Sequence, residues 1–174
     1  MQPPPPQLDT NLNIYDPNLY GDWNAYVAAK VWWDYKRMAL FVIPELFGTL
    51  EFKITLHTAE EKDDFFQVAS LERSIQTSFK KAYPDKDDWT RMPNSFTPVE
   101  INNVHWIKYI KKGDNLNPGY LNYAVPVTSD RYLVVSFYIM KAKDYSDHNW
   151  HNAAQADMEK IMNSFNISYT APQK

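Results

Sequence analysis

Three features are scarce or missing in this sequence, and each absence removes a class of function. The 174 residues contain no cysteine, which excludes disulfides, thiolate catalysis and cysteine metal ligands. Only 4 glycines are present, which leaves little material for loops that cradle phosphate groups. No apolar run approaches the roughly 18 residues of a membrane-spanning helix. We therefore expect no membrane span and no bound cofactor.

The charge of the chain also narrows the choice of partners. The net charge is −3, and the Lys and Arg residues are scattered along the sequence rather than clustered. A nucleic-acid-binding domain is typically basic on one face or along one helix. The composition therefore predicts a partner other than nucleic acid.

Sequence motifs for catalysis and for metal binding are not found. The nucleophile elbow, the zinc-protease pattern, the dinucleotide fingerprint and the phosphate-binding loop are all missing. His148 and His151 are three residues apart but lack a third ligand nearby, whereas a structural zinc site needs four ligands. The acidic run at residues 85–88 lacks the glycine and the final glutamate of a calcium-binding loop. We therefore predict a protein that is neither an enzyme nor a metal-binding protein.

Hydrophobic periodicity predicts an α+β fold. Residues 50–57 alternate apolar and polar side chains, which is typical of a strand with one buried face and one wet face. Apolar residues recur at helical spacing over about residues 60–82 and 147–165, with Thr58 as the cap of the first helix and Ser146 or Asp147 as the cap of the second. Further strands are expected at residues 39–43, 104–110, 120–127, 132–139 and 166–169, with turns at 47–48 and 129–130.

The connections between neighbouring strands are too short for parallel crossovers. We therefore predict an antiparallel sheet of about five to seven strands packed with two main helices. Residues 23–33 fit either a strand or a short helix. The side chains expected to be nearly inaccessible to solvent are those of Phe41, Ile54, Ile75, Phe137, Ile139 and Ile161.

Aromatic residues make up 16% of the chain, and some of them are candidates for a binding surface. The segment from residue 84 to residue 98 is longer than most loops, and it carries Trp89, Arg91 and Met92. Trp89 can anchor a partner, or it can fold back over the sheet's edge. Trp32 and Trp33 are adjacent, so on a strand their side chains point to opposite faces; with Tyr35 they can stack on a partner or be buried under helices on both faces.

The N-terminal segment reads as a tail or tether over residues 1–20, followed by a single domain over residues 21–174. The run Pro3-Pro4-Pro5-Pro6 favours an extended spacer. One interpretation is that an export signal or lipid anchor belongs upstream of this spacer, which would place the protein in the periplasm or attached to the envelope. The other is the natural N-terminus of a cytoplasmic protein.

Three segments resemble the PsbP-like superfamily, which includes the extrinsic photosystem II protein, a Ran-binding import factor and bacterial envelope proteins. They are an early strand that ends in proline (residues 39–44), a strand after a turn (130–137) and a closing helix (158–167). The resemblance covers roughly residues 36–170 and implies an antiparallel sheet sandwiched between helices, with an adaptor or assembly role. That superfamily shares no catalytic centre, so no residue role is carried over.

The leading functional hypothesis is a non-catalytic protein-binding or adaptor module of the bacterial cell envelope. Two alternatives stay open. One is a secretion-system immunity protein that blocks a toxin, and the other is a carbohydrate-binding module that uses exposed aromatic rings.

Overall fold

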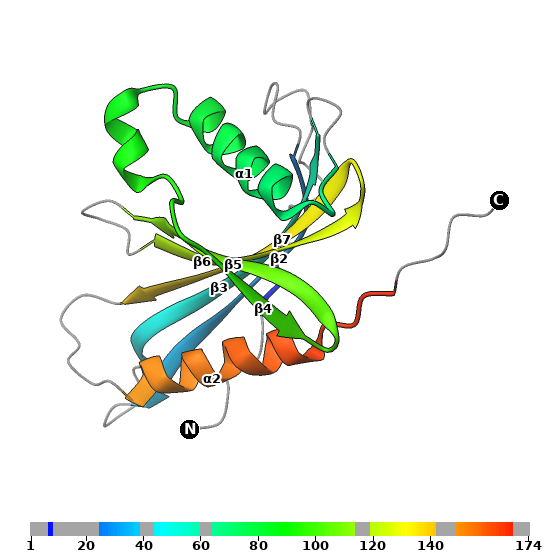
Figure 1. Ribbon diagram of the computed structural model, residues 1–174. Helices are drawn as coiled ribbons and strands as arrows, with labels where there is room; N and C mark the ends of the chain where they lie inside the picture. The colour runs from blue at the N-terminus through cyan, green and yellow to red at the C-terminus, as the bar shows by residue number, and fades with distance from the viewer. Residues whose placement is uncertain are drawn as a thin grey trace.

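The computed structural model of the chain describes residues 7–8, 25–38, 44–59, 64–113, 119–141 and 149–168. These residues form one antiparallel sheet with a main helix on each face, which confirms the predicted α+β fold (Figure 1). The sheet has six long strands and a two-residue edge strand, in the order β1-β2-β3-β7-β6-β5-β4. The strands are β1 Gln7–Leu8, β2 Ala25–Met38, β3 Pro44–Thr58, β4 Phe96–Ile101, β5 Val104–Lys112, β6 Gly119–Thr128 and β7 Arg131–Lys141.

The two helices divide the core between them. Helix α1 (Val68–Ala82) and helix α2 (Asn149–Ser164) lie on opposite sides of the sheet, which we call the α1 face and the α2 face (Figure 1). A short 3-10 helix, η2 (Lys86–Arg91), follows α1. The sheet therefore has two covered faces, and each face has its own apolar cluster.

The cluster on the α2 face is the larger of the two and consists mainly of aliphatic and aromatic side chains. Leu50 and Phe52 of β3 pack there with Phe137 of β7, beneath Trp150 and its neighbours on α2. Gly48 of β3 makes this packing close, because a Cβ at that position would lie 2.3 Å from a ring carbon of Trp150. Gly48 is thus required inside the strand, and the predicted turn at residues 47–48 is wrong.

The cluster on the α1 face is smaller. Helix α1 buries Leu71, Ile75 and Phe79, and Phe65, just before the helix, packs edge-on against Tyr132. His57 of β3 stacks on the Tyr132 ring with ring centroids 4.8 Å apart. The prediction of a wet face on this strand is therefore wrong beneath α1, where Thr55 is 8% exposed.

Several predicted boundaries need correction. Thr58 ends β3 and does not cap a helix; α1 begins at Val68, and its N-cap Gln67 makes no side-chain capping hydrogen bond. Residues 166–168 form no strand. The strand predicted at 39–43 and the caps Ser146 and Asp147 lie outside the described residues. The strands at 104–110, 120–127 and 132–139, the turn at 129–130 and the second helix are confirmed, and residues 23–33 contribute to a strand from residue 25 on.

The predicted core is confirmed in part. Phe137 and Ile75 are nearly inaccessible, at 1% and 5% exposure. Ile54, Ile139 and Ile161 are only partly buried around the α2-face cluster, and Phe41 lies outside the described residues. Within the segment predicted to be a tail, Gln7 and Leu8 pair with Trp32 and Val31 of β2.

Candidate functional site

The segment after α1, predicted to be a binding loop, is folded back onto that helix. It contains η2 and the start of β4 rather than one long loop. The indole Nε1 of Trp89 donates a hydrogen bond to the carbonyl oxygen of Tyr83 at 3.0 Å, and the Lys80 ammonium lies 5.1 Å from the Trp89 ring centroid. Trp89 is half-buried and packs on the C-terminal end of α1.

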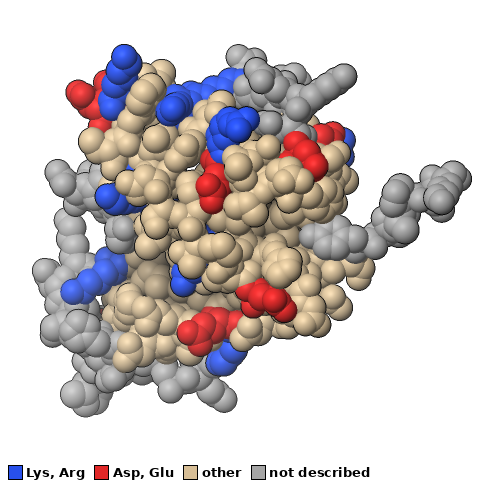
Figure 2. All heavy atoms as spheres, viewed as in Figure 1, with Lys and Arg blue, Asp and Glu red and all other residues tan. Residues whose placement is uncertain are grey.

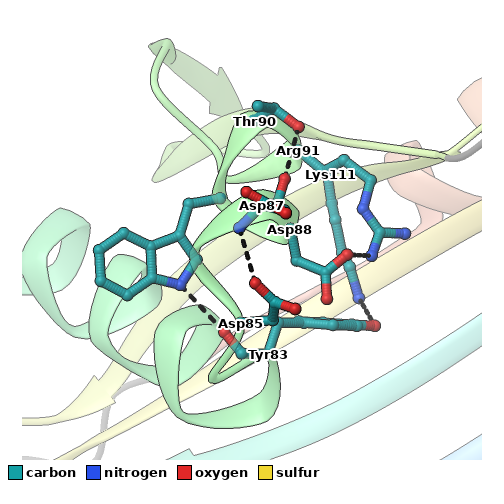
Figure 3. A network of polar contacts seen from close by, with 8 residues as sticks. Tyr83, Asp85, Asp87, Asp88, Thr90, Arg91 and Lys111 are labelled. Atoms are coloured by element: carbon teal, nitrogen blue, oxygen red, sulfur yellow. Dashed lines mark hydrogen bonds and ion pairs between the residues drawn. The ribbon is translucent and has the colours of Figure 1, made fainter.

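Local polar contacts hold η2 in place (Figure 3). The Asp85 carboxylate accepts a hydrogen bond from the Asp87 amide at 3.0 Å, and the Thr90 hydroxyl donates to the Asp87 carbonyl oxygen at 3.1 Å. Arg91 pairs with Asp88 and also places its guanidinium 5.2 Å from the Tyr83 ring centroid. Within the acidic run at residues 85–88, Asp85 thus caps η2 and Asp88 neutralises the charge of Arg91. Met92 is the half-buried C-cap of η2.

The three aromatic candidates on β2 are split between the faces of the sheet. Trp33 packs against the α2-face cluster, and Tyr35 is buried there at 1% exposure, with its hydroxyl donating to Asp157 of α2 at 2.8 Å. Burial and the Asp157 carboxylate raise the pKa of Tyr35. Trp32 is half-buried and opposite Glu51, on the α1 face. Only Trp32 of the three therefore faces the same side as η2.

Sequence reasoning missed a group of lysines and tyrosines on the α1 face, beside the C-terminal end of α1. We call it the lysine–tyrosine cluster and define it as Lys53, Tyr83, Lys111, Tyr120 and Tyr138. The Lys111 ammonium donates to the Tyr83 hydroxyl at 2.7 Å, as Figure 3 shows, and lies 5.8 Å from the Tyr120 ring centroid. The Lys53 ammonium lies 5.5 Å from the same centroid, and Tyr120 stacks on Tyr138 at 4.8 Å. The cluster thus joins four strands to the end of α1.

The strand register explains why these side chains meet. Glu51, Tyr138, Tyr120 and Lys111 are neighbours across β3, β7, β6 and β5, so they point to one face. Lys53 occupies the next row on that face, beside the buried polar residues Ser136 and Asn122. The Ser136 hydroxyl donates to the Asn122 side-chain oxygen at 2.8 Å. This half of the α1 face is therefore polar although much of it is buried.

The cluster carries two ammonium groups that carboxylates do not neutralise. Within the described part of the chain, neither Lys53 nor Lys111 has a carboxylate within ion-pair distance; Glu51, the acidic residue in the adjacent row, pairs with Lys30 at 3.3 Å. Burial lowers the pKa of Lys53, and the charges of Lys111 and Lys30 add to this effect against the opposing influence of Glu51. Burial, with Glu51 next, raises the pKa of Tyr120 to about 12, so its hydroxyl stays protonated. The site therefore holds two ammonium groups among tyrosine rings and hydroxyls, with Tyr138 buried and the other four members half-buried.

The sequence held only a weak signal for this cluster. The positions of Glu51 and Lys53 are visible in the alternation of β3, but Lys111 lies on β5, two strands further along the chain and beyond helix α1. The spatial order β3-β7-β6-β5 differs from the chain order, so sequence spacing does not reveal their proximity. On the face of the molecule seen in Figure 2, basic and acidic side chains lie among wide uncharged areas.

Neither a metal site nor a related protein family is found for the described part of the chain. The described residues hold no group of three or more potential metal-ligating His, Asp or Glu side chains. No helix among them is long and apolar enough to cross a membrane. No family model, curated protein or solved structure matches the chain. The resemblance to the PsbP-like superfamily therefore stays a prediction from sequence.

Proposed function

We propose that this chain is a non-catalytic module that binds another protein through the lysine–tyrosine cluster. The observation that carries the proposal is the pair of ammonium groups of Lys53 and Lys111, half-buried among tyrosine rings without carboxylate partners in the described part of the chain. Tyrosine is enriched at protein interfaces because its ring adds contact area and its hydroxyl adds a hydrogen bond. Arg91 of η2 and Trp32 of β2, two residues singled out from the sequence, flank this surface.

The β4 edge of the sheet is protected against strand addition, which supports the choice of the cluster over this edge. The two-residue turn at Asn102 and Asn103, both with positive φ, makes the flanking pair Ile101–Val104 a hydrogen-bonded one. Pro98 of β4 then falls at a position whose backbone faces away from β5. Proline has no N–H to offer an added strand, so it protects this edge against β-augmentation.

Of the two alternatives predicted from the sequence, carbohydrate binding fits the geometry less well, and an immunity protein is a form of the same proposal. Stacking on sugars needs open ring faces, whereas Tyr35 is buried and Trp32 and Trp33 are half-buried. An immunity protein is one version of a protein-binding module, with a toxin as the partner. Placement in the bacterial envelope rests on Pro3–Pro6 alone, and these residues lie outside the described part.

A capture experiment with matched variants tests the proposal. The full chain is immobilised and exposed to an extract of the cells that produce it, beside Lys53→Gln/Lys111→Gln and the control Lys108→Gln. Lys108 also lies over a tyrosine ring, 5.8 Å from the Tyr123 centroid, but its row belongs to the α2 face. We expect wild type and control to retain the same protein and the double variant to lose it. Equal retention by all three would overturn the proposal.

A Trp89→Ala variant in the same experiment locates the margin of the surface. Lost capture with an unchanged melting temperature would extend the binding surface over η2. A large fall in melting temperature without a specific loss of capture would leave Trp89 as packing for the end of α1.

A further inference from the structure

The positive charge of Lys53 and Lys111 in the cluster indicates that a partner binds there through anionic groups. Lys53 and Lys111 approach the ring of Tyr120 to 5.5 Å and 5.8 Å, so two like charges are held near one point. Their mutual repulsion contributes to the lowered pKa of Lys53. The tyrosine rings offset part of this cost through cation–π attraction. An incoming anion would remove the remainder by pairing with both groups.

We propose that the lysine–tyrosine cluster binds an acidic, extended segment of the partner protein, whose carboxylates pair with Lys53 and Lys111. This proposal rests on the proposed function and adds the chemistry of the partner. The pairing would be strong for a surface contact because the ammonium groups are already partly desolvated and positioned by rings.

The surroundings of the cluster favour discrete carboxylates over a polyanion. Glu51 lies in the same row as Lys111 and Tyr120, and Asp88 is paired to Arg91 beside Tyr83. A continuous phosphate backbone would meet these carboxylates, and the whole chain is also acidic at −3. A peptide with separated carboxylates can place them on Lys53 and Lys111 alone.

An extended segment suits the spacing of the two lysines. Lys53 is on β3 and Lys111 on β5, with β7 and β6 between them, and both side chains reach inward toward Tyr120. In an extended chain, residues two apart point to the same side and lie roughly 7 Å apart. A segment with glutamates at alternate positions therefore offers two carboxylates to the cluster at once.

A pair of synthetic peptides tests this chemistry on the unmodified full chain. One peptide has alternating Glu and Thr residues, and the control peptide has Gln in place of every Glu. We expect the Glu peptide to bind by titration calorimetry at low salt, and the Gln peptide to bind at least about tenfold more weakly. The preference should disappear in Lys53→Gln/Lys111→Gln and persist in Lys108→Gln. Equal binding of the two peptides, or no binding of either, would overturn the proposal of an acidic segment.

Displacement of the Glu peptide by inorganic phosphate and by chloride distinguishes a carboxylate site from a phosphate site. Inorganic phosphate should displace the Glu peptide only at concentrations that act through general salt screening, as chloride of the same ionic strength does. Displacement by phosphate at far lower concentration would assign the cluster to small phosphorylated ligands instead.

The peptide results and the capture experiment fail independently. If capture depends on the cluster but the two peptides bind equally, the protein-binding function stands and the acidic segment is wrong. If capture ignores the cluster, the proposed function is wrong whatever the peptides show.

Discussion

The two faces of this sheet are built from the same strands and differ in what they bury. On the α2 face, Leu50 and the cross-strand pair of Phe52 and Phe137 form an apolar core beneath α2. On the α1 face, apolar rows lie beneath α1 only, and the rows beyond them carry Lys53, Ser136 and Asn122. All of these side chains are buried or half-buried, including the polar ones.

This difference indicates that polarity on the α1 face is not simply the solvent side of an amphipathic sheet. Ser136 and Asn122 are 6% and 5% exposed and bond to each other, which satisfies groups that would otherwise be costly to bury. Lys53 next to them keeps a charge that the fold disfavours. Such a charge lowers stability, so it is the position where a binding role is the simplest physical explanation.

The indole ring of Trp150 joins α2 to the α2-face cluster, so its removal should destabilise the protein strongly. Trp150 is 2% exposed and packs on Gly48 and Tyr35. Trp150→Ala should lower the free energy of unfolding by about 3–5 kcal/mol, because the cavity adds to the lost transfer energy. Chemical denaturation measures this, with Trp89→Ala as the control that should cost less since Trp89 is only half-buried. Equal losses would mean that α2 does not carry the main core.

His57 on the α1 face should make the free energy of unfolding decrease at acid pH. Burial, with a further contribution from Lys53, lowers the pKa of His57 from 6.5 to about 4. The unfolded chain therefore takes up this proton first as pH falls, so stability is complete above pH 6.5 and declines toward pH 4. The loss should reach on the order of 3 kcal/mol.

Substitution isolates this contribution from the carboxylates that titrate over the same range. In His57→Gln the difference in stability between pH 7 and pH 4.5 should be smaller than in wild type. His105→Gln, at an imidazole whose side chain is 90% exposed, should follow wild type. A pH profile of His57→Gln that coincides with wild type would show that His57 is not buried against Tyr132.

The residues explain how far the sequence could predict this structure. Alternation over residues 50–57 identified β3, and apolar spacing identified both helices, because each signal is local. The start of α1 was predicted too early, since Phe65 fits the helical spacing but packs before the helix against Tyr132. The adjacent pair Asn102–Asn103 was an overlooked hairpin signal.

The candidate site was less accessible to prediction for a topological reason. The sequence predicts Trp32 and Arg91 as candidate binding residues; Arg91 lies over the Tyr83 ring, and Trp32 pairs with Glu51, beside the cluster. Lys53 and Lys111 were not chosen, because their proximity depends on β7 and β6 lying between β3 and β5. Tyr35 looked like its neighbours in sequence, but its register with Gly48 places it in the α2-face core.

The smallest expected effect gives the most specific test of the polar half of the α1 face. Lys53→Met keeps an unbranched, flexible side chain that is one atom shorter and removes its charge. The change loses a cation–π contact with Tyr120, worth about 0.5–2 kcal/mol, and also removes the cost of a partly buried ammonium. Burial lowers the pKa of Lys53, and the charges of Lys111 and Lys30 add to this effect against the opposing influence of Glu51, so burial and repulsion disfavour the charge. We therefore expect Lys53→Met to be as stable as wild type at pH 7 or more stable, within about 1 kcal/mol.

The pH dependence fixes the sign of this expectation. Because the pKa of Lys53 is lower in the folded chain than in the unfolded one, the unfolded state holds the proton to higher pH. The penalty is present below the folded pKa and disappears as pH rises toward the ordinary lysine value, so wild type should gain stability relative to Lys53→Met over that alkaline range. Denaturant unfolding at pH 7 and at alkaline pH measures the difference, with Lys108→Met as the control. If Lys53→Met is clearly less stable at pH 7, Lys53 is a structural residue; if it is as stable but captures less partner, its charge is retained for binding.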